Sequence, residues 1–197
     1  MTNQTKWSID QSHSEIVFKI KHLMIANVRG AFKTFDASIY TAEKDFNSVE
    51  IDLWIDPASI TTGDEKRDEH LKGADFFDVE NHKQITFVSD SIERTDSISN
   101  HEMWGKLTIK GITKTVKLNV QFGGIEIDPN GIEKAGFTAV FIIRRSEWGL
   151  IWNKTLETGG LLLSDEVKIS CEIELSNIVP ENLTRELELS SDQKSSL

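Results

Sequence analysis

Hydrophobic and polar residues alternate at every second position along most of this chain, which is the pattern of β-strands that bury one face. In the segment 14–22, one face holds Ile16, Phe18, Ile20 and His22, and the other holds Lys19 and Lys21. The same pattern recurs in the segments 28–32, 35–39, 49–55, 84–89, 103–110, 116–122, 137–145 and 167–175. The chain is therefore predicted to be all-β.

Turn residues separate these segments at short intervals. The Asp-Pro-Asn-Gly sequence at 128–131 predicts a hairpin because Asn-Gly tolerates positive φ angles, and 110–114 also links two strands closely. Phe32 and Phe35 have opposite parity, which predicts a bulge or bend near residues 33–34. Short turns imply antiparallel neighbours. We therefore expect an antiparallel, lipocalin-like β-barrel of about eight strands, with a sandwich as the alternative.

One segment breaks the β pattern and predicts a short α-helix in the loop after the third strand. Thr62 and Glu65 have the spacing of a capping box, and the charged run that follows stops at Gly73. The segment lacks a wide apolar stripe, so we expect Phe76 and Phe77 to anchor it.

The C-terminal end of the chain differs in composition from the rest. Residues 178–197 contain too little apolar surface for a second core. We therefore expect one barrel domain, residues 1–177, and a polar C-terminal tail, residues 178–197. Leu183, Leu187 and Leu189 allow either a short helix on the barrel or a partner, or simple disorder.

The charge balance argues against some partners. With 22 Lys and Arg against 32 Asp and Glu, the formal net charge is −10, which opposes binding to nucleic acids and anionic lipid surfaces. We expect no nucleic-acid partner, although a local basic patch could still receive a phosphate or carboxylate head group. No run of about 18 apolar residues occurs, so no stable membrane insertion is expected. The start of the chain has no secretion signal, which predicts a cytoplasmic protein, or a periplasmic one if a leader was removed.

Residues that could support catalysis or bind metal form no recognisable motif. The five His residues are scattered, and Cys171 stands alone among alternating apolar positions, so we expect no metal site. The sequence has no Gly-x-Ser-x-Gly elbow, Gly-rich phosphate loop or His-Glu-x-x-His helix. We expect no catalytic residue.

Three polar residues do not fit a simple surface role. His22 and Arg145 share the parity of apolar residues in their strands, and Arg67 lies beside Asp68 in the predicted helix. Inward polar groups need partners. One interpretation places His22 and Arg145 at strand ends, exposed or bonded to backbone. The other places a polar cluster at the barrel mouth, where it would orient the head group of a ligand.

A series of short motifs between residues 7 and 175 resembles the YceI-like family, a lipid-binding group similar to lipocalins in fold. Eight motifs occur in the expected order: Trp7-Ser8-Ile9-Asp10-Gln11-Ser12-His13-Ser14, Lys21-His22, Gly30-Ala31-Phe32, Ser59-Ile60-Thr61-Thr62-Gly63, Arg67-Asp68-Glu69-His70-Leu71, Asp75-Phe76-Phe77-Asp78, Gly105-Lys106-Leu107-Thr108-Ile109-Lys110-Gly111 and Arg145-Ser146-Glu147-Trp148-Gly149. In the last motif, Glu147-Trp148 replaces the usual Asp-Phe, which could reshape the cavity if Trp148 faces inward.

The resemblance implies an antiparallel barrel that binds polyisoprenoids, isoprenoid quinones or fatty-acid-like chains, often as a homodimer, with the helix near the barrel opening. We therefore expect a non-catalytic carrier or storage protein that needs no cofactor and holds an isoprenoid or acyl lipid. His22, Arg67 and Arg145 are expected near the polar end of that ligand. The expected apolar lining is Ile16, Phe18, Ile20, Phe32, Ile51, Leu53, Leu71, Phe76, Phe77, Ile85, Phe87, Leu107, Leu118, Val120, Phe122, Phe137, Phe141, Trp148 and Ile169.

Two rival functions stay open at this point. The barrel could be fully packed and act as a structural or stress-response interaction module, because sequence does not distinguish a filled interior from a hollow one. The chain could also be an enzyme that acts on an isoprenoid lipid, which would require a converging acid, base or metal.

Overall fold

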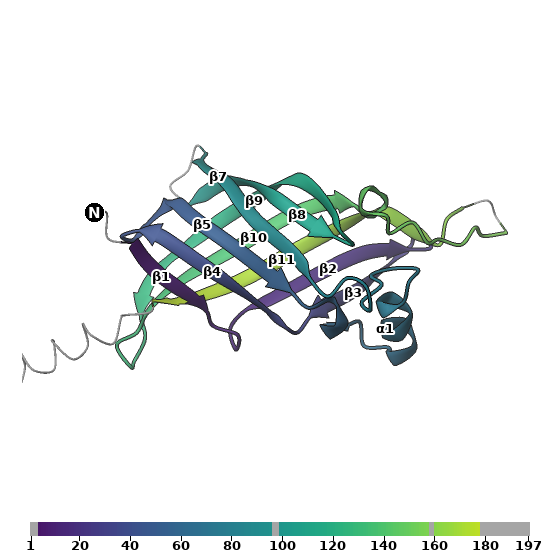
Figure 1. Cartoon of the computed structure of the whole chain (residues 1–197), viewed down its shortest axis with the longest axis horizontal. Coiled ribbons are helices and arrows are strands. Elements are labelled where there is room, and N and C mark those ends of the chain that lie inside the picture. The colour runs from purple at the N-terminus through teal and green to yellow at the C-terminus, as the bar shows by residue number, and fades with distance from the viewer. Residues whose placement is uncertain (1–3, 96–98, 158–159, 178–197) are drawn as a thin grey trace, which may run out of the picture.

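The computed structural model describes residues 4–95, 99–157 and 160–177 as an antiparallel β-barrel with one α-helix, α1 (Glu65–Lys72), against one end (Figure 1). The strands are β1 (Gln4–Ile9), β2 (Glu15–His22), β3 (Ala26–Phe32), β4 (Phe35–Ala42), β5 (Asp45–Ile55), β6 (Ile60–Thr61), β7 (Ile85–Arg94), β8 (Asn100–Ile109), β9 (Ile112–Ile127), β10 (Glu133–Arg144) and β11 (Leu163–Asn177). Two 3₁₀ turns, η1 (Pro57–Ser59) and η2 (Arg145–Trp148), complete the fold.

These strands occupy eight positions around a closed barrel. The long strand β11 pairs with β1 near its C-terminal end and with β2 near its N-terminal end, so β1 and β2 act as one bent strand. In the same way, β4 pairs with β1, and β3 pairs with β2. The pairing of β1 with β11 closes the ring. The sequence prediction of an eight-stranded antiparallel barrel is confirmed, and the sandwich alternative is not.

The predicted bend lies where the barrel wall changes direction. β3 ends at Phe32 and β4 begins at Phe35, so residues 33–34 interrupt the alternation. The predicted close connection at 110–114 is a tighter turn, in which Lys110 and Gly111 both have positive φ angles, 49° and 73°. Because only these two residues separate β8 from β9, the two strands form a regular hairpin.

The helix forms where it was predicted, but a different residue caps it. Asp64, and not Thr62, is the N-cap, because its carboxylate accepts a hydrogen bond from the Arg67 amide at 3.0 Å. Thr62 instead donates its hydroxyl to Asp68 at 2.6 Å, which ties the helix back to β6. The helix ends at Gly73. None of its residues is fully buried, so its position depends on the loop that follows.

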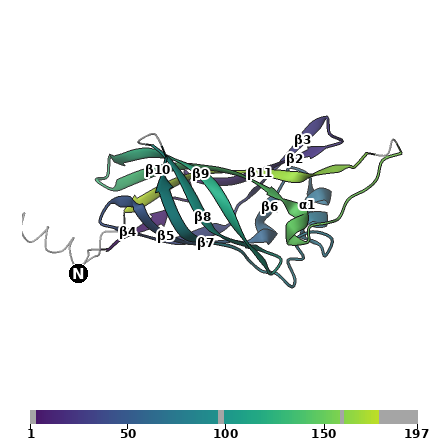
Figure 2. The same ribbon diagram turned by 90° about the horizontal axis from the view of Figure 1, so that it is seen from above.

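The two ends of the barrel differ. At the mouth end lie α1, the β2–β3 turn (residues 23–25) and residues 150–157, and the turn and this segment project beyond the barrel in Figures 1 and 2. At the far end lie the β9–β10 turn (residues 128–132) and a cluster of the aromatic rings of Trp7, Phe46, Phe122 and Phe137. Ring centroids 4.8–5.5 Å apart close this end of the core.

Among the described residues, no helix is both long and apolar enough to cross a membrane. The expectations for the tail, including a helix around Leu183, Leu187 and Leu189, lie outside the described residues.

Candidate ligand cavity

A cavity of about 520 Å³ occupies the mouth end of the barrel interior, under α1. Its centre is a row of inward side chains on three adjacent strands, because Ile169 on β11 lies opposite both Phe18 on β2 and Phe141 on β10. Ligand sites in proteins typically have volumes of about 300–1,000 Å³. The cavity is lined by Ile16, Phe18, Ile20, His22, Val28, Phe32, Ile55, Asp64, Lys66, Arg67, His70, Leu71, Phe76, Phe77, Ile85, Leu107, Ile109, Phe141, Ile143, Arg145, Leu150, Trp152, Leu162, Leu163, Val167 and Ile169.

Arg145 is the most buried of the charged residues that line this cavity, with 5% of its surface exposed. Its guanidinium donates to the backbone carbonyls of Ser164 and Trp152, both at 2.9 Å, and to that of Leu150. Desolvation lowers its pKa, and the charge of Asp165 offsets part of this effect. Arg145 thus lines the cavity and is satisfied by backbone carbonyls, and its role in orienting a head group stays a prediction.

Arg67 contributes the helix side of the mouth. Its Nε donates to the hydroxyl of Thr62 at 2.7 Å, and a terminal nitrogen donates to the Thr62 carbonyl at 3.0 Å. Asp68 accepts from the same threonine, so Arg67 and Asp68 are joined through Thr62. The Arg67 side chain is half-buried and lines the cavity. His22 is also half-buried and lines the cavity at the end of β2.

His70 and Trp152 are functional candidates that sequence reasoning missed. Their rings pack edge to face with centroids 4.8 Å apart, and both contact Phe76. His70 also lies 3.1 Å from the carboxylate of Asp75. These contacts join α1 to the segment before β11. His70 belongs to a motif in the sequence, but neither residue lies in a strand with alternating residues. No alternation pattern therefore indicated that their side chains face the interior.

A second, smaller cavity of about 120 Å³ lies farther along the barrel, toward the far end. No charged residue lines it, and Ile16 borders both cavities. Its walls are Ile9, Ile16, Ala37, Ile39, Phe46, Val49, Ile51, Leu53, Phe87, Ile92, Met103, Leu118, Val120, Phe137, Ala139, Cys171, Ile173 and Leu175. The interior therefore has a large chamber with a polar rim and a small, wholly apolar one.

The residues predicted to line the interior divide between the two cavities. The larger one contains Ile16, Phe18, Ile20, Phe32, Leu71, Phe76, Phe77, Ile85, Leu107, Phe141 and Ile169, together with the predicted polar residues His22, Arg67 and Arg145. The smaller one contains Ile16 again, with Ile51, Leu53, Phe87, Leu118, Val120 and Phe137.

Two predicted lining residues do not border either cavity. Phe122 stacks on Phe137 and belongs to the aromatic cluster of the far end. Trp148 is 2% exposed, and its indole N–H donates to the Leu107 carbonyl at 3.2 Å. Trp148 is a packed core residue, and Phe122 is partly buried against the core. The replacement of Phe by Trp in the last motif therefore fills core volume outside the cavity walls.

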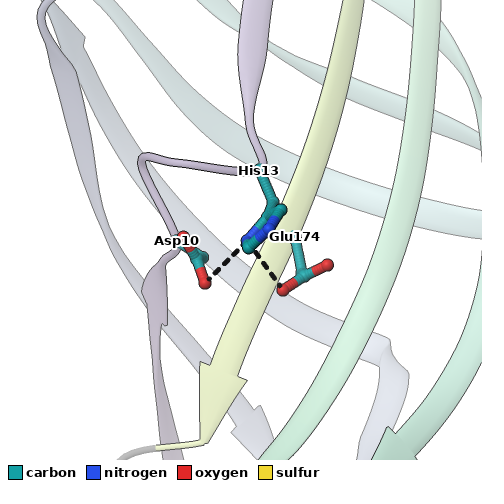
Figure 3. Close-up of side chains that lie close together, drawn as sticks. All are labelled: Asp10, His13 and Glu174. Atoms are coloured by element: carbon teal, nitrogen blue, oxygen red, sulfur yellow. Dashed lines mark ion pairs between the residues drawn. The ribbon is translucent and has the colours of Figure 1, made fainter. Parts of the chain in front are cut away.

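The described part of the chain holds one group of side chains with the spacing of metal ligands, Asp10, His13 and Glu174, shown in Figure 3. Their ligand atoms lie within 4.8 Å of one another. The Lys134 ammonium lies 2.6 Å from Asp10 and 3.2 Å from Glu174, so a cation already bridges the two carboxylates. The hydrogen bond from Lys134 holds the pKa of Asp10 far below its usual range. This group ties the β1–β2 corner to β10 and β11.

Comparison with known proteins identifies relatives across the whole barrel. Residues 7–175 match the model of the YceI-like domain. A UPF0312 protein of Staphylococcus epidermidis is 40% identical over 173 residues, which cover 87% of this chain and 98% of that protein. A UPF0312 protein of Staphylococcus aureus is 38% identical over the same length.

Solved structures share the fold. The Burkholderia cenocepacia protein BcnA has a TM-score of 0.73 and 27% identity, with 84% of this chain and 98% of that chain covered. The Campylobacter jejuni YCEI protein has a TM-score of 0.67 and 31% identity, covering 81% and 90%. A polyisoprenoid binding domain from Saccharophagus degradans has a TM-score of 0.63 at 16% identity, covering 87% and 98%.

Proposed function

Since this chain belongs to the YceI-like family, we propose that it binds and carries one long apolar molecule, an isoprenoid or acyl chain, inside the barrel. The observation that carries the proposal is the large cavity, whose walls are apolar except for charged residues gathered at the mouth end. The Saccharophagus degradans neighbour, described as a polyisoprenoid binding domain, supports a ligand of this class.

Burial of apolar surface supplies the binding energy in this proposal. Each methylene group removed from water contributes about 0.8 kcal/mol. Association costs several kcal/mol before any net affinity appears, so a short chain binds weakly and a long one tightly. Lys66, Arg67 and His70 at the mouth would set the direction in which the chain enters. Such a role needs no reacting group, and we infer that the protein is not an enzyme.

The described interior also bears on the packed-barrel alternative. A fully packed core has few voids larger than a water molecule. A chamber of about 520 Å³ between β2, β10, β11 and α1 is far larger than that. The interaction-module hypothesis therefore lacks the filled interior it requires.

The first experiment is native mass spectrometry of the gently purified protein, followed by organic extraction and identification of the released compound. The proposal predicts one prenyl or acyl compound per chain. Protein stripped of it should then bind a ladder of saturated fatty acids with affinity rising about fourfold per added methylene, which is the methylene increment converted at room temperature, until the cavity is full.

A matched pair of variants tests the location. Ile169→Trp fills the centre of the large cavity and is expected to weaken binding at least tenfold, while Glu166→Trp, exposed on the same strand, leaves it unchanged. An apo mass that does not change with any fatty acid or quinone would overturn the proposal. So would equal affinities of the two variants.

A further inference from the structure

Large apolar side chains protrude into solvent at the mouth end, and four of them belong to the β2–β3 turn and the residues just before β11. Leu23, Met24 and Ile25 form the β2–β3 turn and are 36%, 56% and 86% exposed, and Leu161 is 52% exposed. The Leu23 amide donates to the carbonyl of Leu162 at 2.8 Å, so the turn and the start of β11 lie side by side. We call these four residues the apolar lip. It stands next to the chamber, because Leu162, Leu163 and His22 line the cavity.

The backbone of this turn makes the apolar residues unexpected. Leu23 and Met24 have φ angles of 53° and 60°, a left-handed conformation that strains L-residues other than Asn, Asp and Gly. Hairpin turns with two such residues are normally Asn-Gly or a similar pair. Fold stability therefore does not account for Leu and Met here.

Basic residues flank the lip on the outer face of the same strands. Lys168 on β11 lies opposite Lys19 on β2, which lies opposite Arg29 on β3, and Lys21 is closer to the turn. Within the described ranges, no acidic oxygen lies within 4.0 Å of the charged nitrogens of these four residues. In a chain of net charge −10, these four residues form a local cationic surface that makes no ion pair within 4.0 Å in the described ranges.

The spacing of the two features fits the edge of a lipid bilayer. Lys21 is the second-last residue of β2 and lies just behind the turn, and Lys19 is two residues, about 7 Å, farther along the strand. Amphipathic surface segments bury their apolar side chains about 5–10 Å deep, and anionic lipids attract basic residues within a Debye length of about 8 Å. With the lip in the acyl boundary, Lys21 reaches the headgroups and the other three cations lie just above them.

We propose that the mouth end of the barrel docks on an anionic lipid surface, with the apolar lip inserted and Lys19, Lys21, Arg29 and Lys168 against the headgroups. A second copy of this chain is disfavoured as occupant, because a two-fold interface brings the same patch against itself and would oppose four cations to four. The charge of the patch and the protrusion of aliphatic tips both match a lipid surface. Docking opens the chamber toward the membrane, a consequence that rests on the proposed function.

Vesicle flotation tests the docking without any cargo. Stripped protein is mixed with vesicles of phosphatidylcholine alone or with about one third phosphatidylserine. Binding is expected to be at least tenfold stronger to the anionic vesicles and to fall with added salt. Ile25→Asp is expected to weaken it at least tenfold, and Lys19→Gln and Lys168→Gln about fivefold each. The control Ile127→Asp, equally apolar and 69% exposed at the far end, should bind like the unchanged protein.

A turn variant separates docking from folding. Leu23→Asn with Met24→Gly relieves the left-handed strain, so this protein should unfold at a higher temperature and yet bind anionic vesicles at least tenfold more weakly. Equal vesicle binding by this variant and the unchanged protein would overturn the proposal, as would equal binding to both kinds of vesicle. A dimer that dissociates with Ile25→Asp, in protein that ignores vesicles, would assign the lip to a second copy. Fatty-acid binding in detergent-free solution is measured in parallel, and its loss would count against the proposed function alone.

Discussion

The two chambers of the barrel are built from the same inward-facing alternation of apolar residues, but only one of them has a polar rim. The larger chamber, about 520 Å³, ends among charged side chains at the mouth, whereas the smaller one, about 120 Å³, ends at the aromatic cluster of the far end. If the barrel binds a ligand with one polar end, as we propose, we expect its head at the mouth. In the proposed function, a few polar groups would therefore set the direction of entry, while the apolar walls would supply the affinity.

The largest expected effect concerns the polar rim itself. Arg145→Met removes the donor to three backbone carbonyls in a buried position, and unpaired buried acceptors cost about 1–3 kcal/mol each. We expect the free energy of unfolding to fall by about 3 kcal/mol in urea titrations, because these costs do not add fully. Arg144→Met, its exposed neighbour, is the control and should change stability little. If Arg145→Met kept full stability and lost only ligand affinity, Arg145 would instead be a ligand-binding group.

Two glycines sharpen the comparison of the chambers. An added Cβ at Gly105, beside the smaller chamber, would overlap the Phe87 ring and lie 2.6 Å from the Val88 carbonyl oxygen. For an added Cβ at Gly30, beside the larger chamber, the three nearest atoms all belong to the side chains of Phe18 and Thr62. Backbone yields less easily than a ring that borders a cavity.

We therefore expect Gly105→Ala to lower the free energy of unfolding by about 2 kcal/mol, with little direct effect on the larger chamber. Gly30→Ala is expected to cost about 1 kcal/mol or less, because Phe18 can turn into the chamber, and to weaken ligand binding as the free volume shrinks. Urea unfolding and ligand titration of both proteins measure the two quantities. Identical losses of stability and affinity in the two variants would contradict the idea that only the larger chamber has room for a displaced phenylalanine ring.

Much of the barrel could be predicted because the alternation of apolar and polar residues in each strand shows which face is buried. The bend near residues 33–34 and the helix before Gly73 were visible as a change of parity and a change of period. The cap was misassigned because Thr62 and Asp64 are both good cap residues, and only the hydrogen bond from Arg67 decides between them.

The candidate site was harder to predict than the barrel. Inward parity is the same for a residue on a cavity wall and for one in a packed core, so Phe122 and Trp148 could not be separated from Phe141. The contact of His70 with Trp152 joins a helix and an irregular segment, and no periodic pattern predicts it. Whether a barrel is hollow depends on how side chains from all eight positions fill a shared space.

A smaller effect is expected from the ion pairs that tie the β1–β2 corner to the wall. The pKa of Asp10 is lowered by Lys134, so the stabilisation is present above the ordinary carboxyl pKa of 3.8 and is lost as pH falls below it. Lys134→Met should lower the free energy of unfolding by about 1 kcal/mol at pH 7, because both side chains are 18% exposed, and by less at pH 3. Lys106→Met, whose pair with Asp90 spans 3.9 Å in solvent, is the control. A loss that grows as pH falls would contradict this sign.

The smallest change, in reactivity alone, tests whether one ligand occupies both chambers. Cys171 is the one cysteine of the chain and lines the smaller chamber, where burial raises the pKa of its thiol to about 12. At pH 8 the thiolate is then about a thousandfold scarcer than for a free cysteine, so iodoacetamide should react very slowly. Glu172→Cys in a Cys171→Ala background places a thiol on the outer face of the same strand and should react at an ordinary rate.

Bound ligands then report how deep they reach. An acyl chain long enough to pass Ile16 would cover Cys171 and slow its residual alkylation by an apolar maleimide, whereas a short chain confined to the mouth chamber would not. The length at which protection begins measures the span from the polar rim to the smaller chamber. Mass spectrometry of the labelled protein gives the rate. A single chain anchored by its head at the mouth must protect Cys171 in order of length. If long chains protected Cys171 no better than short ones, the ligand would not pass Ile16, and the two chambers would hold separate contents.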